Sequence, residues 1–114
     1  MDALLKTASG GATVHHHADA RIALVIVTYN SGEVLPGLLD SLEAGLEGVE
    51  RYEVIVVDNA SRDDSVALAR AHPIGVTVIE TGRNAGYAAG INAAVATLTP
   101  DTDVLVLNPD VRLQ

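Results

Sequence analysis

Short aliphatic runs alternate along the chain with segments in which apolar residues recur every three or four positions. The runs are continuous and rich in β-branched residues, so they predict buried strands at 22–27, 54–57, 76–79 and 104–107. The spacing between them predicts three helices. The first carries Leu35, Leu38, Leu39, Leu42 and Leu46, and the third carries Tyr87, Ile91, Ala94, Val95 and Leu98. The order βαβαβαβ with short connections predicts a three-layer α/β fold, a mainly parallel four-stranded sheet with helices on both faces.

Turn and capping residues predict where the helices begin and end. Pro36 falls in the first turn of the first helix, where a missing N–H costs nothing. Ser61 is the predicted N-cap of the second helix, with Asp63 and Asp64 in the first turn, where the helix dipole favours negative charge. Pro73 marks the exit from that helix.

The first twenty residues lack this periodicity. They contain Ser9-Gly10-Gly11 and His15-His16-His17, so we expect a flexible leader at 1–20 followed by one α/β domain at 21–114. The three histidines could bind a metal ion. A solvated tail is the favoured interpretation, because adjacent residues on a mobile chain rarely form a closed site.

Composition narrows the classes of function. Hydrophobic residues make up 48% of the chain and charged residues 19%, which predicts a buried core. The formal net charge of -8 argues against nucleic acid as a partner. An anionic ligand would then need a local device, such as a helix N-terminus, an arginine or a cation. The absence of cysteine excludes disulfides and a cysteine nucleophile. No apolar run approaches the roughly 18 residues that span a bilayer, so we expect a cytoplasmic protein.

Polar side chains follow each of the four predicted strands. In chain order they are Thr28, Tyr29 and Asn30, then Asp58, Asn59 and Ser61, then Arg83 and Asn84, and finally Asn108 and Asp110. Parallel strands end at one edge of a sheet, and ligands of open α/β sheets bind there. Each cluster alone is explained by capping or turn formation. The four together, with a tyrosine and an arginine that no turn requires, favour a binding site.

A nucleotide suits these side chains. Asp58 can accept N–H donors from a pyrimidine or a ribose hydroxyl, and Tyr29 can lie against a base. Arg83 and the N-terminus of the third helix, opened by Gly86, can face a diphosphate. Asp110 can hold a divalent cation. The dinucleotide-binding glycine motif, the P-loop and the Gly-x-Ser-x-Gly elbow are all missing.

Four segments, at 27–31, 56–65, 82–92 and 107–110, closely resemble glycosyltransferase family 2, and within it the rhamnosyltransferase-like branch. The resemblance covers about residues 21–113. It implies the Rossmann-like half of a GT-A fold, an inverting transfer and a nucleotide-diphosphate-sugar donor, dTDP- or UDP-linked. The implied nucleotide-binding residues are Thr28, Tyr29, Asn30, Asp58, Arg83, Asn84, Gly86 and Asn108.

The resemblance also implies a cation, Mg²⁺ or Mn²⁺, with Asp110 as its ligand. Asn108-Pro109-Asp110 stands where the family has Asp-x-Asp, and one carboxylate in place of two weakens the predicted affinity. A literal Asp-x-Asp at 101–103 precedes the strand at 104–107 and so lies at the wrong edge of the sheet. We expect it to terminate the third helix.

No residue is assigned as a catalytic base. The family's base and acceptor site come from a later half that nothing here matches, so we expect no transferase activity from this chain alone. The implied setting is cell-wall or polysaccharide biosynthesis, at the inner membrane surface in a full-length protein. Two other interpretations stay open: a non-catalytic nucleotide-binding or assembly module, and a plain α/β domain whose edge residues are only caps.

An exposed edge on the strand at 104–107, or the face of the third helix, predicts a homodimer or higher assembly.

Overall fold

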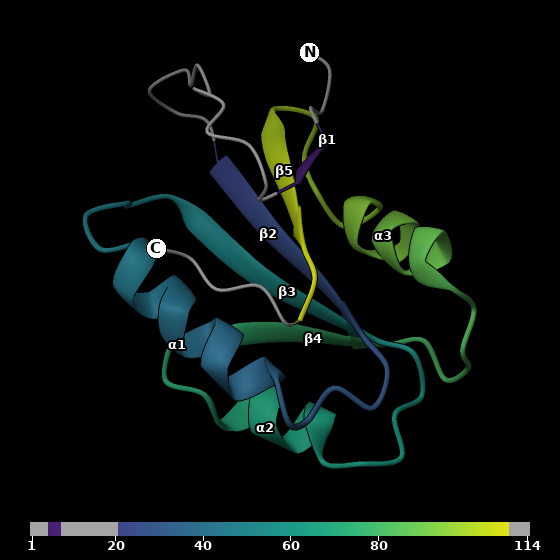
Figure 1. Cartoon of the computed structure of the whole chain (residues 1–114). Helices are drawn as coiled ribbons and strands as arrows, with labels where there is room; N and C mark the ends of the chain where they lie inside the picture. The colour runs from purple at the N-terminus through teal and green to yellow at the C-terminus, as the bar shows by residue number, and fades with distance from the viewer. Residues whose placement is uncertain (1–4, 8–20, 110–114) are drawn as a thin grey trace.

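The computed structural model describes residues 5–7 and 21–109. They form a five-stranded, all-parallel sheet in the order β1-β5-β2-β3-β4 (Figure 1). The strands are β1 (Leu5–Thr7), β2 (Arg21–Thr28), β3 (Tyr52–Asp58), β4 (Val76–Glu80) and β5 (Thr102–Leu107). The helices are α1 (Leu35–Gly45), α2 (Ser65–Ala71) and α3 (Tyr87–Val95). The predicted α/β fold is confirmed.

Helices cover both faces of the sheet (Figure 1), as predicted. On one face, alternate residues of β2 and β3 pack against four leucines of α1 and against Ala69 of α2; the buried set is Leu24, Ile26, Val54, Val56, Leu35, Leu38, Leu39 and Leu42. On the other face the intervening residues pack with α3; this set is Val25, Val27, Ile55, Val57 and Ala94. Burial on both faces explains why these strands are continuous apolar runs.

The sheet has one strand more than predicted. β1 pairs in parallel with Val104–Val106 of β5, inside the segment for which we predicted a flexible leader. That prediction is therefore wrong for residues 5–7. The expected bare edge of β5 is occupied over these three residues, so dimerisation through that edge loses its basis, and dimerisation through the α3 face stays a prediction. The three adjacent histidines lie outside the described residues.

The start of α2 also differs from prediction. The helix begins at Ser65, so Ser61 is not its N-cap, and Asp63 and Asp64 precede the helix. Asp63 acts as the local acceptor instead: its Oδ1 atom accepts hydrogen bonds from the backbone N–H of Ser65 at 3.0 Å and from the Ser65 hydroxyl at 2.5 Å. Ser61 is used in a contact with the end of β3, and this contact delays the helix by four residues.

A glycine brings α3 close to the sheet. A Cβ atom at Gly90 would lie 3.0 Å from Cγ1 of Val27 and 3.1 Å from its Cγ2 atom. A side chain at this position would therefore crowd Val27, and glycine allows the close approach of α3 to β2. The contact lies near the carboxyl end of β2 and sets the position of the first turn of α3 beside that end.

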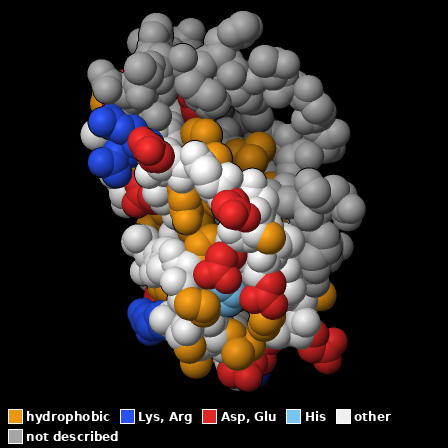
Figure 2. All heavy atoms as spheres, turned by 90° about the vertical axis from the view of Figure 1, so that its left-hand side faces the viewer, with side chains coloured by type: hydrophobic (Ala, Val, Ile, Leu, Met, Phe, Trp, Pro, Cys, Tyr) orange, Lys and Arg blue, Asp and Glu red, His pale blue; other side chains and the backbone are white. Residues whose placement is uncertain are grey.

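On the opposite face, a histidine joins the two other helices. The backbone N–H of Ile74 donates to Nδ1 of His72 at 3.1 Å, so Nε2 carries the hydrogen and donates to Asp40 Oδ1 of α1 at 2.7 Å. The view of Figure 2 shows aspartate and glutamate side chains gathered on this side of the molecule, interspersed with hydrophobic ones. The mainly acidic character of this side agrees with the formal net charge of -8.

Candidate functional site

The carboxyl ends of the strands form one edge, which we call the rim. Thr28 of β2 pairs with Asp58 of β3, Asp58 pairs with Glu80 of β4, and Leu107 of β5 pairs with Ile26 of β2. The polar clusters that follow these strands are thus brought together, as the sequence predicted. Asp110 of the fourth cluster lies outside the described residues, and the roles of all these residues in binding stay predictions.

Asp58 lies at the centre of the rim and is 2% exposed. Its Oδ1 atom accepts hydrogen bonds from the Thr28 hydroxyl at 2.6 Å and from the Ser61 hydroxyl at 2.5 Å. Its Oδ2 atom accepts one from the backbone N–H of Ser61 at 2.9 Å. Hydrogen bonds to a charged acceptor are among the stronger ones in proteins. The carboxylate therefore fastens the end of β2 to the loop that follows β3.

Those two loops, 29–34 and 59–64, are interlocked by further hydrogen bonds. The bonds run from Asn30 N to Ser61 Oγ (2.8 Å), from Arg62 N to Asn30 Oδ1 (2.8 Å), from Ser31 N to Ser65 Oγ (2.9 Å) and from Gly32 N to Asp63 Oδ2 (2.9 Å). Asn30 and Ala60 adopt positive φ angles of 50° and 59°, which turn each loop toward the other. The two loops consequently form one unit, although about thirty residues separate them in sequence.

One aspartate of this unit is electrostatically tuned. The hydroxyl of Ser65 and the backbone N–H of Gly32 lower the pKa of Asp63 from its ordinary value. Gly32 lies close to two carboxylates of this unit, because a Cβ atom there would lie 2.6 Å from Oδ1 of Asp64 and 3.0 Å from Oδ2 of Asp63, and these side chains would have to shift. The carboxylates of Asp63 and Asp64 thus lie next to Gly32 of the other loop.

A second connection runs from β3 to the loop before α3. Asn59 is 2% exposed, and its side-chain amide donates to the carbonyl oxygen of Gly86 at 3.1 Å. Its amide oxygen accepts from the hydroxyl of Thr81 at 2.9 Å. Sequence analysis placed Asn59 at the rim without a role. A polar residue directly after a buried strand was the available signal, but a turn explains such a residue equally well.

Several rim groups are open to a ligand. Tyr29 is 49% exposed, and Arg83, Asn84 and Asn108 are exposed as well. Gly86, with φ of 94°, precedes α3, whose first turn carries no acidic residue and no side-chain cap. Tyr87, the first residue of α3, is 48% exposed, and partial burial raises the pKa of its hydroxyl. The rim therefore offers an aromatic ring, a guanidinium group and backbone N–H donors around the interlocked loops.

The described residues supply little of a metal site. Asn108 is exposed directly after β5, while Asp110 lies outside the described residues. Within the described part of the chain, no three histidine or acidic side chains cluster to hold an ion. Asp101 and Asp103 lie at the amino end of β5, as predicted, and Asp101 accepts a hydrogen bond from the Thr99 hydroxyl at 2.8 Å. Asp101 thus serves the turn that leads into the strand.

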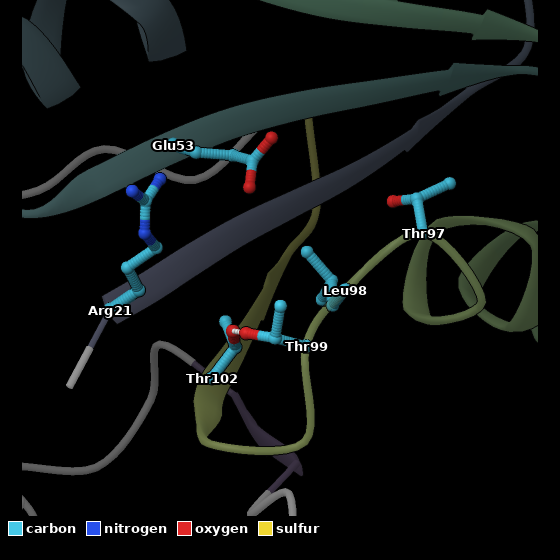
Figure 3. A pocket seen from close by; sticks show the side chains of 6 residues that line it. All are labelled: Arg21, Glu53, Thr97, Leu98, Thr99 and Thr102. Atoms are coloured by element: carbon cyan, nitrogen blue, oxygen red, sulfur yellow. Dashed lines mark hydrogen bonds between the residues drawn. The ribbon is translucent and has the colours of Figure 1, made fainter.

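A hollow of about 270 Å³ lies at the opposite edge of the sheet (Figure 3). It is lined by Arg21, Glu53, Thr97, Leu98, Thr99 and Thr102, which come from the starts of β2, β3 and β5 and from the segment after α3. The hydroxyls of Thr97 and Thr99 are already engaged, with Ala94 O at 2.7 Å and with Asp101. The hollow is separate from the rim and shares no residue with it.

Comparison with known proteins places the chain among sugar transferases. The model of the family "Glycosyl transferase family 2" matches residues 23–113. An undecaprenyl-phosphate 4-deoxy-4-formamido-L-arabinose transferase of Pseudomonas syringae is 37% identical over 97 residues, which are 80% of this chain and 28% of the relative. An N-acetylglucosaminyl-diphospho-decaprenol L-rhamnosyltransferase of Mycobacterium tuberculosis is 32% identical over 101 residues, 80% of this chain and 32% of the relative.

A solved structure agrees with these relatives. A mannosyltransferase of Pyrobaculum calidifontis, in complex with GDP-Man and Mn²⁺, superposes with a TM-score of 0.71 at 27% identity, over 79% of this chain and 27% of that one. The chain thus spans less than a third of the length of the curated relatives described above. Among the described residues, no helix has the length and apolar character needed to cross a membrane.

Proposed function

Because the chain belongs to glycosyl transferase family 2, we propose that its rim binds the nucleoside diphosphate portion of a nucleotide-sugar donor for inverting glycosyl transfer. The mannosyltransferase with a similar fold carries GDP-Man, which supports this ligand class. The sequence resemblance to the rhamnosyltransferase-like branch favours a dTDP- or UDP-linked donor.

The interlocked loops are the observation that carries the proposal. Residues that only capped a helix or closed a turn would form local hydrogen bonds, as Thr99 does with Asp101. At the rim, a buried carboxylate instead joins Thr28 to Ser61 across two loops. A satisfied buried network of this kind rigidifies its surroundings, and a rigid site loses little entropy when a ligand binds.

We assign the following roles to five of the predicted residues. Tyr29, exposed beside the interlocked loops, provides a ring for stacking on the base. Oδ2 of Asp58 accepts one hydrogen bond and keeps a second lone pair for a base N–H. Arg83 and the open N-terminus of α3 provide donors for the diphosphate. Thr28 and Asn30 shape the rim through their bonds to Asp58, Ser61 and Arg62.

We propose that a divalent cation accompanies the diphosphate, with Asp110 as its carboxylate ligand and Asn108 beside it. Mn²⁺ in the similar mannosyltransferase supports this assignment. The exposed position of Asn108 directly after β5 fits a ligand at the rim, and an amide oxygen suits a hard cation such as Mg²⁺ or Mn²⁺.

Calorimetry with UDP, dTDP and GDP in turn, with and without Mg²⁺ or Mn²⁺, tests the proposal on residues 1–114. We expect binding of one nucleotide, weakened about tenfold in Arg83→Ala because a charge-assisted hydrogen bond is lost. Arg21→Ala is the matched control, since Arg21 is also an exposed arginine but lies at the opposite edge. If the wild type bound no nucleotide, or if both variants weakened binding equally, the proposal would be refuted and the rim residues would be only caps and turn residues.

We propose that residues 1–114 alone do not transfer sugar. In the proposed complex Asp58 contacts the base and Asp110 the cation, so neither is free to deprotonate an acceptor hydroxyl. Turnover of a bound donor by these residues, in an assay with added sugar or lipid-linked acceptors, would contradict this. Two of the relatives described above are named for activities that involve polyprenyl carriers, which supports an acceptor at a membrane surface.

A further inference from the structure

Asn59 is a buried polar residue whose bonds extend to three elements around the rim. Its backbone N–H donates to the carbonyl oxygen of Thr28 at 2.9 Å, at the end of β2. Its side-chain amide nitrogen donates to Gly86 O at the start of α3, and its amide oxygen accepts from Thr81 directly after β4. A side chain that is 2% exposed and bonded at both its nitrogen and its oxygen is fixed in one orientation.

The loop that Asn59 holds, residues 82–86, lies between β4 and α3. Gly82 and Gly86 have φ angles of 79° and 94°, and a Cβ atom at either glycine would meet nothing within 4 Å. The hydroxyl of Thr81 lies 2.6 Å from Arg83 O, 2.9 Å from Asn59 Oδ1 and 3.2 Å from Asp58 O, so three acceptors share its single hydrogen. The side chains of Asn59 and Thr81 therefore fasten the loop at its beginning and at its end.

We infer that Asn59 is a positioning residue, which sets Arg83 and the N-terminus of α3 for the diphosphate of the donor. This inference rests on the proposed function, because it presumes that a nucleoside diphosphate binds at the rim. Arg83 is exposed, so the position of its guanidinium group relative to a bound anion depends on the position of its backbone. Placing that backbone in advance removes an ordering cost that binding would otherwise carry.

The three bonds of Asn59 separate into two groups that substitution can distinguish. The bond to Thr28 comes from the backbone and is retained when the side chain changes. The bonds to Gly86 and Thr81 come from the side chain and are lost in alanine. The nucleoside side of the rim, with Tyr29 and Asp58, is therefore expected to remain in place when the diphosphate side loosens.

Calorimetric titration of Asn59→Ala with UDP and with uridine tests this directly, or with the corresponding pair for whichever base the wild type binds. We expect the affinity for UDP to fall about tenfold, because the loop without its two side-chain bonds must be ordered when the diphosphate binds. The affinity for uridine should change less than about twofold. An equal loss for both ligands would show general destabilisation and overturn the inference, as would unchanged UDP affinity.

Arg83→Ala in the same background provides a second readout. If Asn59 acts through the loop, Arg83→Ala should cost UDP affinity in the wild type and add little in Asn59→Ala. Full additivity of the two losses would overturn the inference.

Thr81→Val covers the case in which Asn59→Ala does not fold. This variant removes the shared hydroxyl contacts of Thr81 with Asn59 Oδ1, Arg83 O and Asp58 O at a half-buried position. Asn59 keeps its bond to Gly86 O, so the variant should produce a smaller loss that is also selective for UDP. Loss of both ligands, or of neither, in folded Thr81→Val overturns the inference. A wild-type chain that binds neither UDP nor uridine, nor any other pair, would instead refute the proposed function, and the inference with it.

Discussion

Replacing Asp58 with asparagine removes the charge at the centre of the rim with almost no change of shape. The wild-type carboxylate accepts three hydrogen bonds, from the hydroxyls of Thr28 and Ser61 and from the backbone N–H of Ser61. Asparagine can still accept from the N–H with its oxygen. Its NH₂ group then faces the two hydroxyls, which must become acceptors, and their hydrogens lose the partner they had.

The magnitude follows from these three contacts. A hydrogen bond to a charged group contributes about 1.5–3 kcal/mol, against about 0.5–1.5 kcal/mol for a neutral one. The difference, about 1 kcal/mol or more for each of three bonds, is partly offset because asparagine is less costly to bury than a carboxylate. We expect Asp58→Asn to lower the free energy of unfolding by about 2–3 kcal/mol, or Tm by about 10–20 °C.

Urea unfolding followed by circular dichroism measures this loss. Asp64→Asn is the control, because Asp64 lies in the same loop, is exposed, and should change stability by no more than about 0.5 kcal/mol. Thr28→Val removes one of the three donors, so its loss and that of Asp58→Asn should sum to more than the loss of the double variant. A loss in Asp58→Asn as small as that of the control would refute the view that this carboxylate holds the two loops together.

Three further predictions concern stability. Gly90→Ala should destabilise the fold, because crowding against Val27 costs about 1–3 kcal/mol while the gain in helix propensity is about 1 kcal/mol. In thermal unfolding, the double variant with Val27→Ala should recover part of this loss. His72→Ala should cost more free energy of unfolding than Asp40→Ala, since the imidazole is 8% exposed and accepts from a backbone N–H, whereas the carboxylate is 74% exposed; equal losses in urea titration would contradict this. The pKa of Asp63 is lowered, so its charge stabilises the fold at pH above 3.8 and ceases to do so as the pH falls through the lowered value. The difference in Tm between wild type and Asp63→Asn should therefore be present at neutral pH and disappear in acid.

Local sequence pattern was sufficient for the fold. The apolar runs at 22–27 and 54–57 and the leucine spacing of α1 report burial directly, because a strand covered on both faces and a helix covered on one have different periods. β1 was missed because three residues carry no period, and its partner strand lies about a hundred residues away in sequence.

The sequence predicted where the polar residues of the site lie, but not which residues they form hydrogen bonds with. A polar residue after a strand marks the rim, because the topology decides where strands end. The partner of that residue depends on loops distant in sequence. Serine is a common N-cap residue, yet Ser61 forms hydrogen bonds with Asp58 and Asn30. Asparagine is a common turn residue, yet Asn59 holds the loop before α3. Capping and tertiary bonding use the same side-chain atoms, so sequence alone does not separate them.

The interlocked loops also bear on how proteins with this fold can diverge. Backbone N–H groups of each loop are held by side chains of the other, so a change at Asn30 leaves Arg62 without its acceptor, and a change at Ser61 leaves Asn30 without its own. Neither segment is therefore an independent module. Grafting only 29–34 from a relative with another nucleotide preference would import half of a matched pair. Transplants that carry 28–34 and 58–65 together should retain the fold far more often, and co-inheritance of the two segments should be visible when many such sequences are compared.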